Sequence, residues 1–138
     1  LEGLATRLAT PLLKSGEGRA SLLAHYEDLK KKSDQGEVDS YWAVNRSFHQ
    51  FITSASGNER LVDLIENLRR QILKTRVITL RFPGRLAGSM DEHDEILQAI
   101  LEGRERDAES LVIAHLEKQR QFVISVIRTT EEQQEENS

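Results

Sequence analysis

Apolar residues recur at spacings of three and four along almost the whole chain, and no segment alternates apolar and polar residues for long. Spacings of three and four place apolar side chains on one face of an α-helix, whereas a half-buried strand requires alternation. Only two prolines occur, so long helices can run without interruption. The pattern therefore predicts an all-α fold without a sheet.

Glycines, prolines and candidate capping residues divide this pattern into about six helices, and short connections between helices are typical of an antiparallel bundle. We expect the fifth helix to open with a capping box whose N-cap is Ser89. The acidic segment 131–138 lacks apolar residues and is expected to fray. The predicted helices span about residues 1–13, 19–33, 39–56, 59–81, 89–102 and 104–130.

The size and composition of the chain exclude several classes of protein. With 138 residues, 38% of them apolar, the chain is long enough for one domain with a core. A formal net charge of −4 disfavours direct binding to nucleic-acid phosphates. The absence of cysteine excludes disulfides and thiolate metal sites. No apolar run reaches the roughly 20 residues that span a bilayer and no signal peptide is evident, so we expect a cytoplasmic domain without membrane contact.

Three of the four histidines, His49, His93 and His115, fall on the apolar stripes of three different predicted helices. Asn45 lies one turn before His49 on the same face and could add an oxygen ligand. Imidazoles that converge in a bundle core favour zinc, nickel, copper or iron. Spacing alone leaves two interpretations open, a metal site or three histidines satisfied separately by carbonyls or water. His25 lies outside the pattern and is expected at the surface.

Arginines of the fourth predicted helix are the other candidates for a binding role. Arg76 lies among apolar residues, where a guanidinium either extends to solvent or points inward at an anion. The sequence by itself favours the exposed arrangement. Arg69 is a weaker candidate on a similar face, and Arg81 and Arg85 are expected to end the helix or face solvent.

Several segments, in this order, resemble the FCD domain, the C-terminal effector domain of the FadR subfamily of GntR-type transcription regulators. Residues 1–9 resemble its opening helix, residues 45–49 its D/N-x-x-F-H motif, and residues 55–61 its ASGN-x-x-L segment. Residues 92–103 resemble its E-H-x-x-I-x-x-A-I-x-x-G segment, and residues 108–116 the helix that follows. Each motif is weak alone, but their combination covers nearly the whole chain and is highly specific.

The resemblance implies a metal site and an effector cavity in the bundle core. It implies that Asn45, His49, His93 and His115 ligate a divalent transition metal, for which zinc is expected and nickel or another ion remains open. Many members of the family have aspartate where this chain has Asn45, so a weaker affinity or a different preferred ion is expected. The resemblance also implies that Arg76 faces the cavity, which reverses the interpretation from the sequence alone.

The function that the resemblance implies is that of a sensor and not of an enzyme. Residues 1–130 would bind a small organic acid at the metal and control DNA binding by a homodimer. The winged helix-turn-helix domain that reads DNA is absent from this sequence, which starts at Leu1, and we expect it to precede this domain in a longer protein. Two alternatives stay open: a purely structural dimerisation module with a metal staple, and a metal-dependent hydrolase or lyase. The enzyme lacks an obvious general base, because Glu92 and Asp94 are rotated by about 100° from His93 on a helix.

Overall fold

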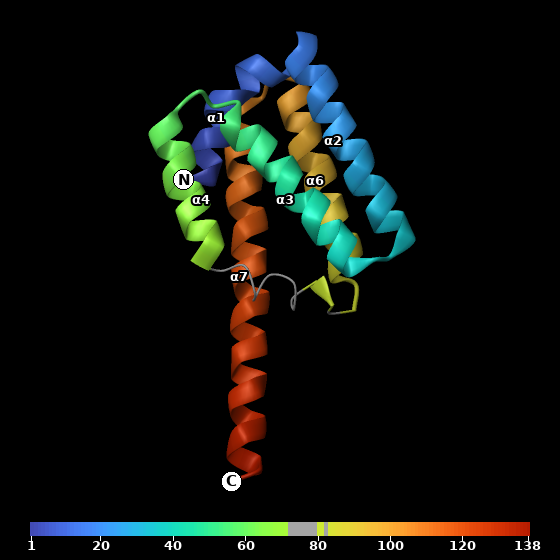
Figure 1. Cartoon of the computed structure of the whole chain (residues 1–138), viewed down its shortest axis with the longest axis vertical. Coiled ribbons are helices and arrows are strands. Elements are labelled where there is room, and N and C mark those ends of the chain that lie inside the picture. The colour runs from blue at the N-terminus through green and yellow to red at the C-terminus, as the bar shows by residue number, and fades with distance from the viewer. Residues whose placement is uncertain (72–79, 82) are drawn as a thin grey trace.

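The structure, a computed structural model, describes residues 1–71, 80–81 and 83–138. These residues form six helices and no strand, as the apolar periodicity predicts. Figure 1 shows the helices gathered around the first half of α7, whose second half extends away from them. The helices are α1 (Glu2–Leu13), α2 (Gly16–Gln35), α3 (Val38–Ser54), α4 (Glu59–Gln71), α6 (Arg85–Leu101) and α7 (Glu105–Glu136).

Small residues on α1 allow this helix to pack closely against α7. A Cβ atom at Gly3 would lie 2.8 Å from the side chain of Ile113 and 3.3 Å from the Glu109 carbonyl oxygen. Two buried threonines on the same helix, Thr6 and Thr10, donate hydrogen bonds of 2.8 Å to the carbonyl oxygens four residues earlier. These bonds satisfy the hydroxyl groups, so α1 can bury polar side chains without unpaired donors.

The main core lies between α1, α2, α3, α6 and α7 and consists largely of aliphatic side chains around two rings, those of Tyr41 and Phe48. Burying one such side chain stabilises a fold by roughly 1.5–3 kcal/mol. The cluster of histidines described below lies in this core, because α3, α6 and α7 also supply its apolar residues. The largest fully buried apolar side chains include Tyr41, Phe48, Leu22, Leu29, Ile52, Ile96, Ile100 and Val112.

Several helices begin earlier than the sequence predicts. Helix α2 starts at Gly16, whose positive φ angle of 64° suits a glycine, and α3 starts at Val38 instead of Asp39. Helix α6 starts at Arg85, four residues before the predicted N-cap Ser89. The prediction of Ser89 as an N-cap is therefore wrong, because its hydroxyl group bonds to core side chains instead of the helix backbone.

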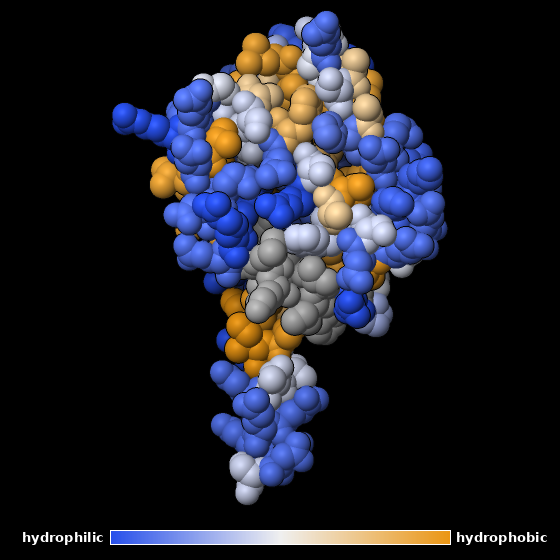
Figure 2. Space-filling view, in the orientation of Figure 1, coloured by the Kyte–Doolittle hydropathy of each residue, from blue (hydrophilic) through white to orange (hydrophobic). Residues whose placement is uncertain are grey.

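The C-terminal ends of α4 and α7 also differ from the predicted boundaries. Helix α4 is described only to Gln71, so most of the predicted continuation to residue 81, including Arg76, lies outside the described residues. Helix α7 continues to Glu136, past the point where fraying is expected, although every side chain from 127 onward is exposed. Figure 2 shows apolar surface on α7 between the body and its polar C-terminal end. Within the described ranges, no helix is long and apolar enough to cross a membrane.

Candidate metal centre

Three helices each contribute one buried histidine to a single cluster. His49 comes from α3, His93 from α6 and His115 from α7, and their exposed fractions are 6%, 0% and 1%. One potential ligand nitrogen of each residue lies within 4.8 Å of the other two. The convergence of the three histidines in the core, which the sequence predicts from their apolar stripes, is thus present in the structure.

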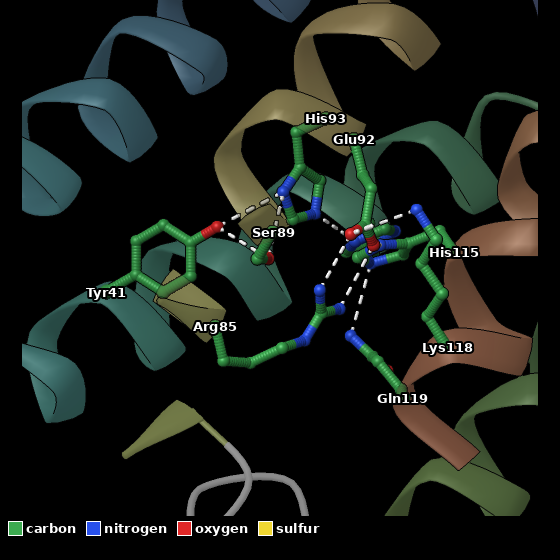
Figure 3. Close-up of polar contacts among 9 residues, drawn as sticks. Tyr41, Arg85, Ser89, Glu92, His93, His115, Lys118 and Gln119 are labelled. Atoms are coloured by element: carbon green, nitrogen blue, oxygen red, sulfur yellow. Dashed lines mark hydrogen bonds and ion pairs between the residues drawn. The ribbon is translucent and has the colours of Figure 1, made fainter. Parts of the chain in front are cut away.

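The ring of His93 is held from behind by two buried hydroxyl groups. Its Nδ1 atom lies 3.1 Å from the Tyr41 hydroxyl oxygen and 3.4 Å from Ser89 Oγ, and the two oxygens lie 2.9 Å apart (Figure 3). Burial lowers the pKa of His93 well below its ordinary value, and it raises the pKa of Tyr41 to about 12. His93 is therefore neutral, which is the form that binds a metal, and Tyr41 keeps its proton.

His115 is held by a carboxylate. Its Nδ1 atom lies 2.6 Å from Glu92 Oε1. Because an ionised carboxylate only accepts hydrogen bonds, Nδ1 carries the proton. In the neutral ring the lone pair then lies on Nε2. A carboxylate behind a histidine is a common support for metal ligands, since it fixes the tautomer and orients the ring.

Glu92 is in turn held by two cations. Arg85 donates two hydrogen bonds to its carboxylate, of 2.7 and 3.0 Å, and Lys118 Nζ lies 3.7 Å away. Partial burial by itself raises the pKa of Glu92, but the hydrogen bonds from His115 and Arg85 outweigh this and hold the pKa at about 2. Glu92 is therefore ionised at neutral pH. Figure 3 shows Arg85, Glu92 and His115 joined in one chain of contacts.

Arg85 corrects an expectation from the sequence. It is only 4% exposed, and its guanidinium carbon lies 5.1 Å from the centre of the Phe122 ring, whereas the sequence favours a solvent-facing or helix-ending role. The reason is the early start of α6. Arg85 and Glu92 are seven residues apart on one helix, so both side chains lie on the same face.

Asn45 contributes an unsatisfied oxygen on the face of α3 that carries His49. The residue is 5% exposed, and its Oδ1 atom accepts no hydrogen bond from the described part of the chain. Leaving such a buried acceptor unpaired costs about 1–3 kcal/mol. Asn45 lies one helical turn before His49, which makes this oxygen a candidate partner for a cation held by the three histidines. Three imidazole nitrogens and one amide oxygen suit a divalent transition metal, so the residues present fit such an ion.

The proton arrangement in the cluster also bears on metal binding. His49 Nε2 lies 2.8 Å from His93 Nε2, which is a hydrogen-bond distance between two ring nitrogens. One of these nitrogens therefore donates a hydrogen bond to the other, and a cation must displace that proton to use both. Nitrogen ligands of a tetrahedral zinc ion lie roughly 3.3 Å apart, so the rings of His49 and His93 would have to separate to share a cation.

Other candidates from the sequence lie away from this cluster. Arg69 is buried, but it pairs with Glu2 at 3.0 Å and with Glu66 at 2.9 Å. His25 is partly buried instead of lying fully at the surface, and it stacks on Phe51 with ring centres 4.8 Å apart.

Sequence reasoning missed five residues that support the cluster. Tyr41 and Glu92 contact a histidine of another helix and Arg85 acts through Glu92, and no local spacing reveals these links to the histidines. The exceptions are Ser89, four residues before His93 on α6, and Gln119, four residues after His115 on α7, and their spacing was a signal present in the sequence. The missed residues are Tyr41, Arg85, Ser89, Glu92 and Gln119.

Comparison with known proteins identifies the family. No curated protein matches the chain. The profile of the FCD domain matches residues 1–118, which is 118 of the 138 residues. FCD is the C-terminal effector-binding domain of GntR-family transcription regulators. The helical fold agrees with this match, and the histidine cluster lies where the resembling motifs meet. The chain therefore belongs to the FCD domain family.

Proposed function

We propose that this domain is a metal-dependent ligand sensor of the FadR subfamily. A divalent transition metal, for which zinc is the favoured ion, binds Asn45, His49, His93 and His115. The observation that carries the proposal is the convergence of three buried imidazoles, each from a different helix, within 4.8 Å. When bound, the metal would supply a positively charged centre that could take one more ligand by expanding its coordination, and the chain supplies the imidazoles and the supports that orient them.

The proposed effector is a small organic acid that reaches the metal through one carboxylate oxygen. Arg76 pairs with the remaining charge of the acid in this proposal. That role rests on the family resemblance, since Arg76 lies outside the described residues.

The proposed output is control of DNA binding by an N-terminal winged helix-turn-helix domain in a cytoplasmic homodimer. A ligand changes such an equilibrium only through different affinities for its two states. A dimer is supported by a stripe of exposed leucines at helical spacing on α1, because exposed apolar stripes often mark protein interfaces. These are Leu1, Leu4, Leu8 and Leu12, which are 42–62% exposed.

The enzyme alternative finds little support. FCD domains belong to regulatory proteins, which are generally not enzymes. A hydrolase or lyase requires a carboxylate or imidazole that is able to take a proton from water. Glu92, the carboxylate that contacts the cluster, already accepts hydrogen bonds from Arg85 and His115. It supports a ligand and is not positioned as a base.

Metal analysis of the purified protein tests the proposal. We expect about one transition-metal ion per chain in the wild type, as a mononuclear site requires. The variant His93→Ala should lose the ion. His25→Ala should keep it, since that histidine lies outside the cluster. Full metal content in His93→Ala would overturn the site.

A thermal-shift screen of small organic acids then tests the sensor. We expect an acid to raise the Tm of the metal-loaded protein and to have little effect on the chelated protein. Arg76→Lys should lower the affinity of the domain for that acid without changing the metal content, because lysine lacks the planar pair of donors that fits a carboxylate. A metal-loaded protein whose Tm responds to no acid would favour a purely structural dimerisation module. Conversion of an acid to a product would favour an enzyme.

A further inference from the structure

A buried glutamine contacts the ring nitrogen of His115 that faces away from Glu92. Gln119 lies one turn after His115 on α7 and is 9% exposed. Its Nε2 atom lies 3.1 Å from His115 Nε2. Figure 3 shows the amide pointing at the imidazole ring. None of the proposed ligand assignments uses this residue.

The direction of this hydrogen bond follows from the other side of the ring. His115 Nδ1 donates a hydrogen bond of 2.6 Å to Glu92 Oε1, so in the neutral form of the ring the lone pair lies on Nε2. The NH2 group of Gln119 therefore donates to that lone pair. The other atom of the amide, Oε1, is buried and accepts no hydrogen bond from the residues that the structure describes. Half of the amide is thus satisfied by the His115 lone pair and half is not.

The same lone pair is the one that a metal requires. A nitrogen cannot accept a hydrogen bond and bind a cation with one lone pair, so Gln119 and the metal exclude each other at His115 Nε2. Once displaced, a buried amide without partners is costly. An oxygen ligand in the metal's open position would provide an acceptor for its N–H group.

We propose that Gln119 caps the metal-binding lone pair of His115 in the metal-free protein and, once displaced, donates its N–H group to the oxygen ligand at the metal. This inference rests on the proposed metal site. It makes Gln119 a residue that lowers metal affinity and raises the affinity of the loaded site for a carboxylate. Replacing a residue with a merely structural role would not change the metal affinity and the carboxylate affinity in opposite directions.

Cobalt titration of the domain tests the first half of the proposal. The variant Gln119→Leu removes the competing donor, so its Co²⁺ affinity, measured by competition with a chromophoric chelator, should rise by roughly two- to tenfold, the worth of one net hydrogen bond. Gln119→Met, which keeps the length of the side chain, should change in the same direction. Gln121→Leu is the matched control, because Gln121 lies exposed on the same helix and donates to Glu117.

Acetate serves as the probe for the second half. Binding of acetate to the cobalt-loaded protein changes the visible absorption of the ion, and its affinity should fall by roughly two- to tenfold in both Gln119 variants. Circular dichroism checks that each variant folds. Unchanged or weaker Co²⁺ binding in folded Gln119→Leu and Gln119→Met would overturn the cap, and unchanged acetate affinity would overturn the second role. Failure of the wild type to bind Co²⁺ would instead refute the metal site itself.

Discussion

At the scale of single residues, His93 and His115 are each held on the side of the ring that faces away from the cluster. Tyr41 and Ser89 hold Nδ1 of His93, and Glu92 holds Nδ1 of His115. The Glu92 carboxylate only accepts hydrogen bonds, so it fixes a proton on His115 Nδ1, whereas the hydroxyl groups beside His93 can donate or accept and hold its ring in place. The packing thus brings the three rings together before any ion arrives, but the proton shared by His49 and His93 must still leave for both to bind a cation.

The Glu92→Gln substitution tests this support. Glutamine keeps the shape of the side chain but loses the charge, so it holds the His115 tautomer less firmly and leaves Arg85 with a weaker partner. We expect zinc affinity to fall by about 10- to 100-fold, the usual effect of losing such a support. Chelator competition measures the change, and Glu95→Gln, an exposed position on α6, is the control. Equal affinity in Glu92→Gln and Glu95→Gln would mean that packing alone orients His115.

The Asn45→Asp substitution tests the fourth ligand. A carboxylate adds a negative charge beside the ion, so zinc affinity should increase by about tenfold. In the metal-free protein the same carboxylate is buried, and the Tm should therefore decrease. The two measurements have opposite signs only if position 45 contacts the ion. Unchanged or weaker zinc binding would remove Asn45 from the ligand set.

At the scale of helices, the sequence predicts the number of described elements, because apolar residues recur at helical spacing along the chain. The buried faces follow less closely, since Leu64 and Leu68 on α4 are 54% and 50% exposed. The boundaries are less predictable. Ser89 has the sequence of an N-cap but lies one turn inside α6, where its hydroxyl group contacts Tyr41. A local pattern does not reveal that a residue 48 positions away competes for the hydroxyl group.

Two glycines inside helices should respond to alanine with opposite signs. In Gly18→Ala the new Cβ atom would lie 2.5 Å from the Leu12 carbonyl oxygen, so backbone must move and we expect a loss of about 1–3 kcal/mol in the free energy of unfolding. In Gly88→Ala the nearest atom is 3.7 Å away, and the better helix propensity should stabilise by about 0.5–1 kcal/mol. Urea unfolding measures both values. A stabilised Gly18→Ala protein would show that the α1–α2 turn adjusts freely.

At the scale of the whole molecule, the sequence predicts which histidines converge but not what surrounds them. His49, His93 and His115 are found because polar residues on apolar stripes stand out. The supports remain hidden, because Glu92 lies 23 positions before His115 and Tyr41 lies 52 positions before His93. Their contacts depend on how α3, α6 and α7 pack, and helical periodicity does not specify the relative rotation of packed helices.

The leucine stripe of α1 provides a test of assembly. Leu8 is 42% exposed, so Leu8→Glu should leave the fold intact while placing a charge in the proposed interface. We expect sedimentation equilibrium to show a dimer for the wild type and a monomer, or a much weaker dimer, for the variant. Gln133→Glu, an exposed change on α7, controls for the single added negative charge. Equally stable dimers in both variants would place the interface elsewhere.

The wide separation of the three histidines along the chain affects how long the protein survives in a cell. An unfolded chain holds positions 49, 93 and 115 far apart and offers no comparable site, so an ion bound to the folded form withdraws molecules from the unfolded population. Proteases act mainly on that unfolded population. If the proposed site is filled in the cell, metal starvation would therefore shorten the half-life of the regulator, and its abundance would report the metal supply independently of any effector.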